Sequence, residues 1–212
     1  MILETIIIVV YSIALLLIFF YALAQLNLLF NFLKTKKQNL KSEKFDFSKQ
    51  EEIPFVTIQL PVYNELYVMK RLLTNISELE YPKDKLEIQV LDDSTDESFE
   101  TTAIQIKTLQ KTGLDIQHIT RSDRKNYKAG ALKEGLKIAK GEFIAIFDAD
   151  FIPQKKWLQL TVPFFKNSEI GVVQTRWGHL NRNFSILTRV QAFALDAHFT
   201  LEHVGRNSKG HF

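Results

Sequence analysis

The sequence contains no cysteine, which excludes disulfide bonds, thiolate catalysis and cysteine-ligated zinc within its 212 residues. Glycine and proline are scarce, with eight and five residues, and these counts exclude a collagenous or low-complexity chain. The excess of positive charge is also small. A formal net charge of +3 is too slight to indicate nucleic acid, and we predict no nucleic-acid partner.

Charge is missing altogether from residues 5–33, which contain no Asp, Glu, Lys, Arg or His. About 20 helical residues suffice to cross the hydrocarbon core of a bilayer, so we predict one transmembrane helix within residues 1–33. A secretory signal peptide is an alternative, but the only charge before the run is Glu4 and the run exceeds a signal core. A buried core helix is another alternative, although soluble cores rarely need so long an uncharged run.

Six lysines and only two acidic residues follow this run between positions 34 and 50. We interpret residues 34–53 as a basic linker. Lysines beside a membrane span stay preferentially on the cytoplasmic side. The sequence therefore predicts a cell (inner) membrane protein whose N-terminus lies outside and whose residues 54–212 form a cytoplasmic domain.

Apolar, strand-like runs alternate with helical patterns after the linker. The expected strands cover residues 55–60, 86–91, 115–120, 143–147 and 171–177. The expected helices cover about residues 65–77, 97–111, 127–139, 155–166 and 184–203. Alternation of this kind predicts an α/β domain with a mostly parallel sheet and helices on both of its faces.

Polar clusters follow three of the expected strands: Pro61-Val-Tyr-Asn-Glu65, Asp92-Asp-Ser-Thr-Asp96 and Asp148-Ala-Asp150. Ligands of parallel α/β sheets bind beyond the carboxyl ends of the strands, so the three clusters are expected to converge on one cleft. The Asp148 and Asp150 carboxylates are hard oxygen ligands that suit Mg²⁺ or Mn²⁺. The alternative is that one of them only caps the following helix.

The cluster Asp92-Asp93-Ser-Thr-Asp96 allows three interpretations. It matches the DDxxD of prenyl-diphosphate enzymes, but those acidic residues lie on a helix and these follow a strand-like run. Ser94 or Asp96 can instead cap the next helix. In the third interpretation, an Asp at the strand end hydrogen-bonds a nucleoside base or ribose, as in dinucleotide-binding folds.

A basic stretch opens the third expected helix: Arg121, Arg124, Lys125 and Lys128. Cations and free backbone N–H groups at a helix start favour anions, although a solvated basic face is an alternative. We favour Lys128 as a phosphate ligand because its small neighbours, Ala129-Gly130, would let a phosphate approach closely. In the last expected helix, His198 and Glu202 are four residues apart; a polar helix face is favoured there over a metal site.

Five motifs together resemble glycosyltransferase family 2, and most closely its membrane-bound cellulose synthase-like and glucomannan mannosyltransferase branch. They are Pro61-Val-Tyr-Asn-Glu65, Asp92-Asp-Ser-Thr-Asp96, Lys128-Ala-Gly-Ala-Leu132, Phe147-Asp-Ala-Asp-Phe151 and Gln174-Thr-Arg-Trp177. The resemblance covers about residues 54–212 and implies a glycosyltransferase A-type fold with Mg²⁺ or Mn²⁺. It further implies a nucleotide-sugar donor of the UDP-glucose or GDP-mannose type. The sugar would pass with inversion to a growing β-linked glycan acceptor at the lipid bilayer.

The resemblance also implies roles for individual residues. Tyr63, Glu65 and Asp93 would hold the nucleoside, and Lys128 would face the diphosphate. Asp148 and Asp150 would form the metal site, with Asp150 the more direct ligand and Asp148 also part of the nucleotide-sugar site. Acceptor-side candidates are Gln174, Arg176 and Trp177.

The catalytic base of this family lies in a downstream Thr-Glu-Asp-type motif, which residues 54–212 do not contain. We therefore expect the base beyond Phe212 and a domain truncated on its C-terminal side. A membrane-anchored nucleotide-binding domain without catalysis is one alternative.

A haloacid-dehalogenase-like phosphatase is another alternative, because Phe147-Asp-Ala-Asp-Phe151 resembles its strand end. In that family, however, the acidic pair normally closes the first strand, and here three expected strands precede it. Ile152 also stands where that family usually has Thr or Val. A glycosyltransferase should release nucleoside diphosphate, whereas the phosphatase should release inorganic phosphate from a monoester.

Overall fold

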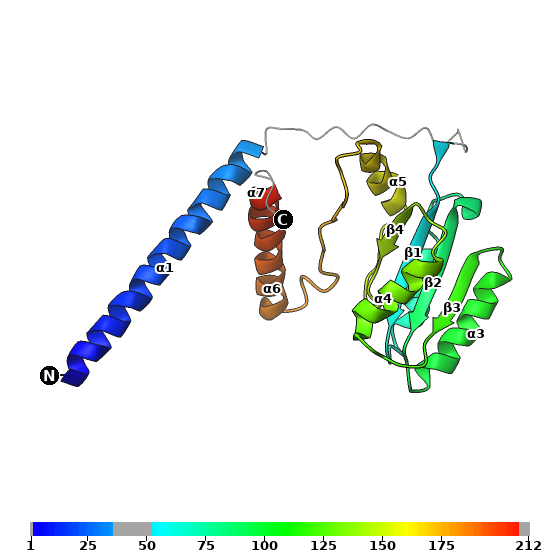
Figure 1. The fold of residues 1–212 in the computed structure, drawn as a ribbon, viewed down its shortest axis with the longest axis horizontal. Coiled ribbons are helices and arrows are strands. Elements are labelled where there is room, and N and C mark those ends of the chain that lie inside the picture. Colours follow the sequence, from blue (N-terminus) through cyan, green and yellow to red (C-terminus); the bar gives the residue numbers. More distant parts are fainter. Residues whose placement is uncertain (1, 36–51, 208–212) are drawn as a thin grey trace. The chain divides into compact units, whose positions relative to one another are not determined.

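The computed structural model describes residues 2–35 and 52–207 (Figure 1). The described chain divides into two units: residues 2–35 with 172–207 form one, and residues 52–171 form the other. Most of the predicted basic linker lies outside the described residues.

A sheet of four parallel strands forms the centre of the second unit, in the order β3-β2-β1-β4. The strands are β1 (Val56–Val62), β2 (Leu86–Asp92), β3 (Asp115–Thr120) and β4 (Phe143–Ile146). A helix lies in each of the three connections between consecutive strands, as parallel pairing requires. The predicted parallel sheet is thus confirmed for its first four strands.

Helices cover both faces of this sheet, as predicted (Figure 1). They are α2 (Met69–Ser77), α3 (Ser98–Gln110), α4 (Tyr127–Ile138) and the short α5 (Trp157–Thr161), with 3₁₀ turns at Lys83–Lys85 and Val162–Lys166. On one face, Leu72 of α2, Ile106 of α3 and Leu158 of α5 share one apolar core with Ile58 and Val90 of the strands. Burial of such side chains stabilises the fold by about 1.5–3 kcal/mol each.

The opposite face of the sheet is polar and lies under α4 (Figure 1). Thr57, Gln59, Glu87 and Gln89 on this face are at most 1% exposed. The Thr57 hydroxyl donates to Glu87 Oε2 at 2.7 Å, and Gln59 Nε2 donates to Gln89 Oε1 at 3.0 Å. A Cβ on Gly135 of α4 would come within 2.7 Å of Gln59 Nε2, so the helix packs closely on this layer. These buried polar groups are tolerated because they hydrogen-bond to one another.

The first unit contains α1 (Ile2–Thr35), a 34-residue helix with a mean hydropathy of 2.9 in its most apolar part. By length and composition it could cross a membrane. The same unit contains α6 (Ile186–Ala197), a π-helical turn (His198–His203) and α7 (Val204–Asn207). A Cβ on Gly205 would lie only 2.9 Å from the carbonyl oxygen of Leu28, so α7 approaches the backbone of α1 closely.

The predicted fifth strand, residues 171–177, is wrong. Within the described part of the chain this segment pairs with no strand and is irregular. Val172 is 80% exposed. An apolar run forms a strand only where a neighbouring strand accepts its backbone hydrogen bonds, and a short run in the sequence does not identify that neighbour.

Three helix boundaries also differ from the prediction. Helix α2 begins at Met69 because the preceding residues form turns, which start after Asn64 adopts a left-handed φ of 56°. The pattern at 155–166 is split into α5 and a 3₁₀ turn that contains Pro163, which lacks an N–H group. The last long helix begins at Ile186, after a capping box formed by Ser185 and Thr188.

Candidate functional site

The three predicted polar clusters lie at one edge of the sheet. Val62, the last residue of β1, pairs with Asp92, the last residue of β2. The Asp93 N–H then donates to the Val62 carbonyl at 3.1 Å. The Phe147 N–H donates to the carbonyl of Gln59, which extends the pairing of β4 with β1 to the residue before Asp148. We call the predicted residues at this edge the strand-end cluster: Tyr63, Glu65, Asp93, Lys128, Asp148 and Asp150.

Asp93 is held by a bidentate contact with Arg121. Arg121 Nε donates to Asp93 Oδ1 at 2.8 Å, and Arg121 Nη2 donates to the other carboxylate oxygen. The same guanidinium donates to the carbonyls of Lys125 and Tyr127, at 2.9 and 3.0 Å. The hydrogen bond to Asp93 raises the pKa of Arg121 above its usual value. Arg121 therefore joins Asp93 to the loop that precedes α4.

Tyr63 presents the face of its ring to a planar cation. The guanidinium carbon of Arg124 lies 3.3 Å from the centroid of the Tyr63 ring. Arg124 Nε is 3.8 Å from Asp93 Oδ2 and, within residues 2–35 and 52–207, has no hydrogen-bond partner. The Tyr63 ring, 40% exposed, can therefore stack with a flat group next to the Asp93 carboxylate.

Asp92, the residue before Asp93, has a different environment. Its side chain is fully buried, and its Oδ2 lies 2.8 Å from Nε2 of His118 on β3. Burial favours the protonated acid, but hydrogen bonds from His118 and Ser94 outweigh it and hold the pKa of Asp92 below its usual value. His118 is not among the site residues predicted from the sequence. Its position at the carboxyl end of an expected strand was the available signal.

Lys128 forms an ion pair with Asp148 across the strand-end cluster, through Asp148 Oδ1. Asp150 is exposed, and in the part of the chain that the structure describes its carboxylate contacts no donor. The described residues also contain no group of three His, Cys, Asp or Glu side chains that could hold a metal ion. Mg²⁺ is commonly bound by one or two carboxylates together with waters and substrate phosphates. The Asp148 and Asp150 pair therefore fits a divalent ion whose shell the substrate completes.

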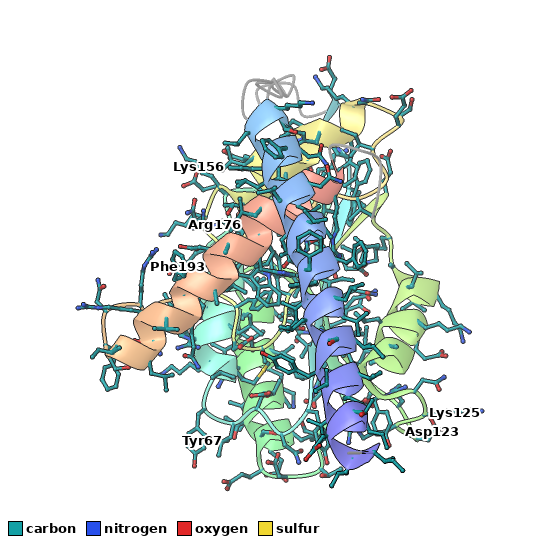
Figure 2. All side chains as sticks on the ribbon, turned by 90° about the vertical axis from the view of Figure 1, so that its left-hand side faces the viewer. Tyr67, Asp123, Lys125, Lys156, Arg176 and Phe193 are labelled. Atoms are coloured by element: carbon teal, nitrogen blue, oxygen red, sulfur yellow. The ribbon has the colours of Figure 1, made fainter. Side chains whose placement is uncertain are left out.

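From the sequence, the small residue Gly130 was expected to let a phosphate approach Lys128. In the structure, its close neighbour is instead the loop before α4. Gly130 is buried, and a Cβ there would lie 2.0 Å from the carbonyl oxygen of Lys125 in the preceding loop. That loop, which carries Asp123 and Lys125 (Figure 2), returns to α4 through Asn126 and Tyr127, with positive φ values of 61° and 46°. The absence of a side chain at position 130 thus admits the protein's own loop.

The acceptor-side candidates lie in the first unit. Arg176, labelled in Figure 2, forms an ion pair with Asp196 of α6. Trp177 is 46% exposed, and its ring centroid is 5.5 Å from that of Phe199. Gln174 is exposed. These contacts place the irregular segment 174–177 against the last long helix of its own unit.

His198 and Glu202 contact each other along that helix. His198 Nδ1 is 3.0 Å from Glu202 Oε2, and His198 Nε2 is 2.9 Å from His203 Nε2. Arg206 Nη2 lies 3.6 Å from the same Glu202 oxygen. The pair therefore belongs to a polar strip of side chains that hydrogen-bond or form ion pairs, which agrees with the favoured interpretation of a polar helix face.

Sequence comparison identifies relatives over most of the chain. Residues 57–210 match the sequence model described as Glycosyl transferase family 2. A probable glucomannan 4-beta-mannosyltransferase from Oryza sativa subsp. japonica is 46% identical over 156 residues, which cover 71% of this chain and 27% of that protein. A glucomannan 4-beta-mannosyltransferase from Cyamopsis tetragonoloba is 37% identical over 200 residues, covering 90% of this chain and 38% of that protein. The chain spans well under half the length of these curated relatives.

A solved structure shares the fold. A mannosyltransferase from Pyrobaculum calidifontis, in complex with GDP-Man and Mn²⁺, matches with a TM-score of 0.64 and 29% sequence identity. The match covers 78% of this chain and 47% of that one. It confirms the predicted glycosyltransferase A-type fold. In that relative a divalent metal ion accompanies the nucleotide sugar.

Proposed function

Because the chain belongs to glycosyl transferase family 2, we propose that its strand-end cluster binds a nucleotide-sugar donor for transfer to a growing β-linked glycan. The observation that carries the proposal is the Lys128–Asp148 ion pair beside Asp150, at the end of the sheet that also bears Tyr63 and Asp93; among the described residues the Asp150 carboxylate has no partner. A cation and two carboxylates suit a diphosphate with its metal ion. An aromatic ring beside a carboxylate suits a nucleoside. The diphosphate and the nucleoside of a donor would thus both find complementary groups at the same end of the sheet.

Tyr63, Glu65 and Asp93 are proposed to hold the nucleoside. The Arg124 guanidinium on the Tyr63 ring supports this proposal, because a flat base could stack in the same way next to a carboxylate able to accept its N–H groups. GDP-mannose and UDP-glucose are the donor types to consider, since both bases carry such N–H groups. The relative that contains GDP-Man supports testing the former first.

Asp148 and Asp150 are proposed to hold Mg²⁺ or Mn²⁺. When bound, the ion would neutralise the diphosphate and so favour its departure as the leaving group. Lys128 would then exchange its contact with Asp148 for one with the diphosphate, because its side chain is 53% exposed and can reach a bound ligand. Inversion of the anomeric centre requires the acceptor hydroxyl to attack from the side opposite the diphosphate.

Gln174, Arg176 and Trp177 are proposed to lie on the acceptor side. The half-exposed indole of Trp177 offers a flat apolar surface on which a sugar ring can stack. The ion pair between Arg176 and Asp196 would hold the segment that carries this ring. The acceptor would be the growing glycan.

The donor proposal predicts a selective effect of Lys128→Ala. The substitution removes a cation placed at the phosphates, so we expect the affinity for nucleoside diphosphate to fall about tenfold, as for loss of a charge-assisted contact. Nucleoside monophosphate should be affected by less than about threefold. Isothermal titration of the chain in detergent with GDP, UDP, GMP and UMP, in the presence of Mn²⁺, measures both values.

Lys137→Ala is the matched control. Lys137 lies further along α4 and pairs with Glu134 at 2.7 Å, so its loss should leave every nucleotide affinity unchanged. Equal losses of nucleotide affinity from the two substitutions would show that the basic stretch is only a solvated helix face and not a phosphate site. Failure of the unsubstituted chain to bind any of the four nucleotides would contradict the proposed function.

We also propose the membrane arrangement that the lysines indicate: a span within residues 1–33, a basic linker at 34–53 and a transferase domain at 54–212 in the cytoplasm of a cell (inner) membrane protein. A reporter active only outside the cytoplasm should stay inactive when fused to the C-terminal end of the chain. Exchange of the six linker lysines for glutamine should produce a mixed orientation, because this excess of lysine is the orienting signal. An active reporter on the unsubstituted chain would contradict the proposal.

A further inference from the structure

His118 lies outside the strand-end cluster, yet its ring is fixed on two sides. Its Nε2 is 2.8 Å from Asp92 Oδ2, and the side chain of Asp92 is fully buried. Phe99 of α3 packs against the imidazole, with ring centroids 4.8 Å apart and planes inclined by 34°. A buried carboxylate needs such a partner, because an ionised group without one is costly inside a protein.

Asp92 connects His118 to the loops at the carboxyl ends of the strands through hydrogen bonds. Its Oδ1 accepts the Ser94 N–H at 2.8 Å, and Ser94 Oγ accepts the Asn64 N–H at 2.9 Å. The Thr95 N–H in turn donates to Asn64 Oδ1 at 2.9 Å. A continuous series of hydrogen bonds therefore runs from His118 on β3, through the end of β2, to the loop after β1.

This series ends beside the residues proposed to hold the nucleoside. Asn64 separates Tyr63 from Glu65, and Asp93 lies between Asp92 and Ser94 in the chain. Asn64 has a left-handed φ of 56°, a conformation that asparagine adopts more readily than most residues with a side chain. Its two hydrogen bonds to Ser94 and Thr95 hold the loop in this conformation.

We propose that His118 is a positioning residue for the nucleoside, which acts through Asp92 to fix the two loops that carry Tyr63, Glu65 and Asp93. The inference rests on the proposed donor-binding function of these loops. Lys128 and Asp150 belong to other segments, outside this hydrogen-bond series. Loss of His118 should therefore weaken recognition of the nucleoside and spare recognition of the diphosphate.

The test compares two substitutions and two kinds of ligand. His118→Phe keeps a ring against Phe99 but leaves Asp92 without its partner, whereas His118→Gln keeps an amide donor near the position of Nε2. Titrations of the chain in detergent with Mn²⁺ use GDP, UDP and inorganic pyrophosphate. We expect His118→Phe to weaken nucleotide binding about tenfold, equivalent to about 1.4 kcal/mol. Pyrophosphate affinity should stay within about twofold, and His118→Gln should restore most of the nucleotide affinity.

Ser94→Ala is a second variant that breaks the next link and leaves the contact between His118 and Asp92 intact. The same selective loss is expected from it, so the test stands even if His118→Phe does not fold, as circular dichroism would show. Unchanged nucleotide affinity in folded His118→Phe or in Ser94→Ala overturns the proposal. An equal loss for pyrophosphate also overturns it, because His118 would then be a general structural residue. If the unsubstituted chain binds pyrophosphate but neither nucleotide, the proposed function fails instead.

Discussion

Replacement of Asp150 by asparagine is expected to abolish the gain in nucleotide affinity that Mn²⁺ provides. Asp150 is exposed, and within residues 2–35 and 52–207 its carboxylate has no protein partner, so its charge is available to a metal ion. The proposed site has only two carboxylates, and the substitution removes the charge of one. Removal of a group that only hydrogen-bonds to a metal ligand typically lowers metal affinity about 10–100-fold. Asp150 would be a ligand itself, so we expect its substitution to lower the affinity for Mn²⁺ by roughly 100-fold or more.

The measurement is the dissociation constant of nucleoside diphosphate with Mn²⁺ and, separately, with a chelator. Asp150→Asn should resemble the unsubstituted chain in the chelator and differ from it only with the ion. Asp84→Asn is the matched control, because Asp84 is an exposed carboxylate in the 3₁₀ turn before β2, away from the carboxyl ends of the strands. An Asp150→Asn variant that retains the full Mn²⁺ effect would show that the metal proposal is wrong.

Replacement of Gly130 by alanine is expected to lower the free energy of unfolding by about 2 kcal/mol. The new Cβ would lie 2.0 Å from the Lys125 carbonyl oxygen and 2.5 Å from Arg121 Nη1, so the loop or the helix must move. Overpacking typically costs about 1–3 kcal/mol, and a 2.0 Å approach to a backbone oxygen belongs at the upper end of that range. This cost outweighs the gain of about 1 kcal/mol that alanine has over glycine in a helix. Because Arg121 also holds Asp93, nucleotide affinity should fall as well.

Urea denaturation of the chain in detergent, followed by the fluorescence of Trp157 in a Trp177→Phe background, would measure this loss. The control is Gly171→Ala, since a Cβ at Gly171 has no atom within 4 Å. That substitution should change the free energy of unfolding by less than about 0.5 kcal/mol. A Gly130→Ala variant as stable as the unsubstituted chain would mean that the loop moves aside without cost.

The place of the strand-end cluster, at the carboxyl ends of the strands, was predictable because parallel strands end on the same side of a sheet. Tyr63, Asp93 and Asp148 each follow an apolar run, so alternation of strands and helices was enough to bring them together. Their partners were not predictable in the same way. The contacts of Arg121 with Asp93 and of Arg124 with Tyr63 depend on the path of the loop before α4, which two residues with positive φ determine.

The polar layer under α4 shows a second limit of sequence analysis. Val56-Thr-Ile-Gln-Leu60 and Leu86-Glu-Ile-Gln-Val90 alternate between apolar and polar residues, a pattern typical of a sheet with one solvated face. In the structure, α4 covers this face, as the predicted helices on both faces require, and Gln59 and Glu87 are buried. Burial is acceptable only because neighbouring strands are in register, Thr57 opposite Glu87 and Gln59 opposite Gln89. Such pairing is a tertiary property that a single strand does not reveal.

The strand order also has a consequence for synthesis on the ribosome. Strand β1 pairs with β2 soon after both have emerged, but its other neighbour, β4, is translated only about 90 residues after β1 begins. At about 5–20 residues per second, roughly 5 to 20 s pass before that side of β1 finds its partner. During this interval β1 is an open edge, a template on which another chain can add a strand. Substitutions that delay the pairing of β4 with β1 would therefore reduce the yield of folded protein, because nascent chains would misassemble. They would not weaken the finished sheet.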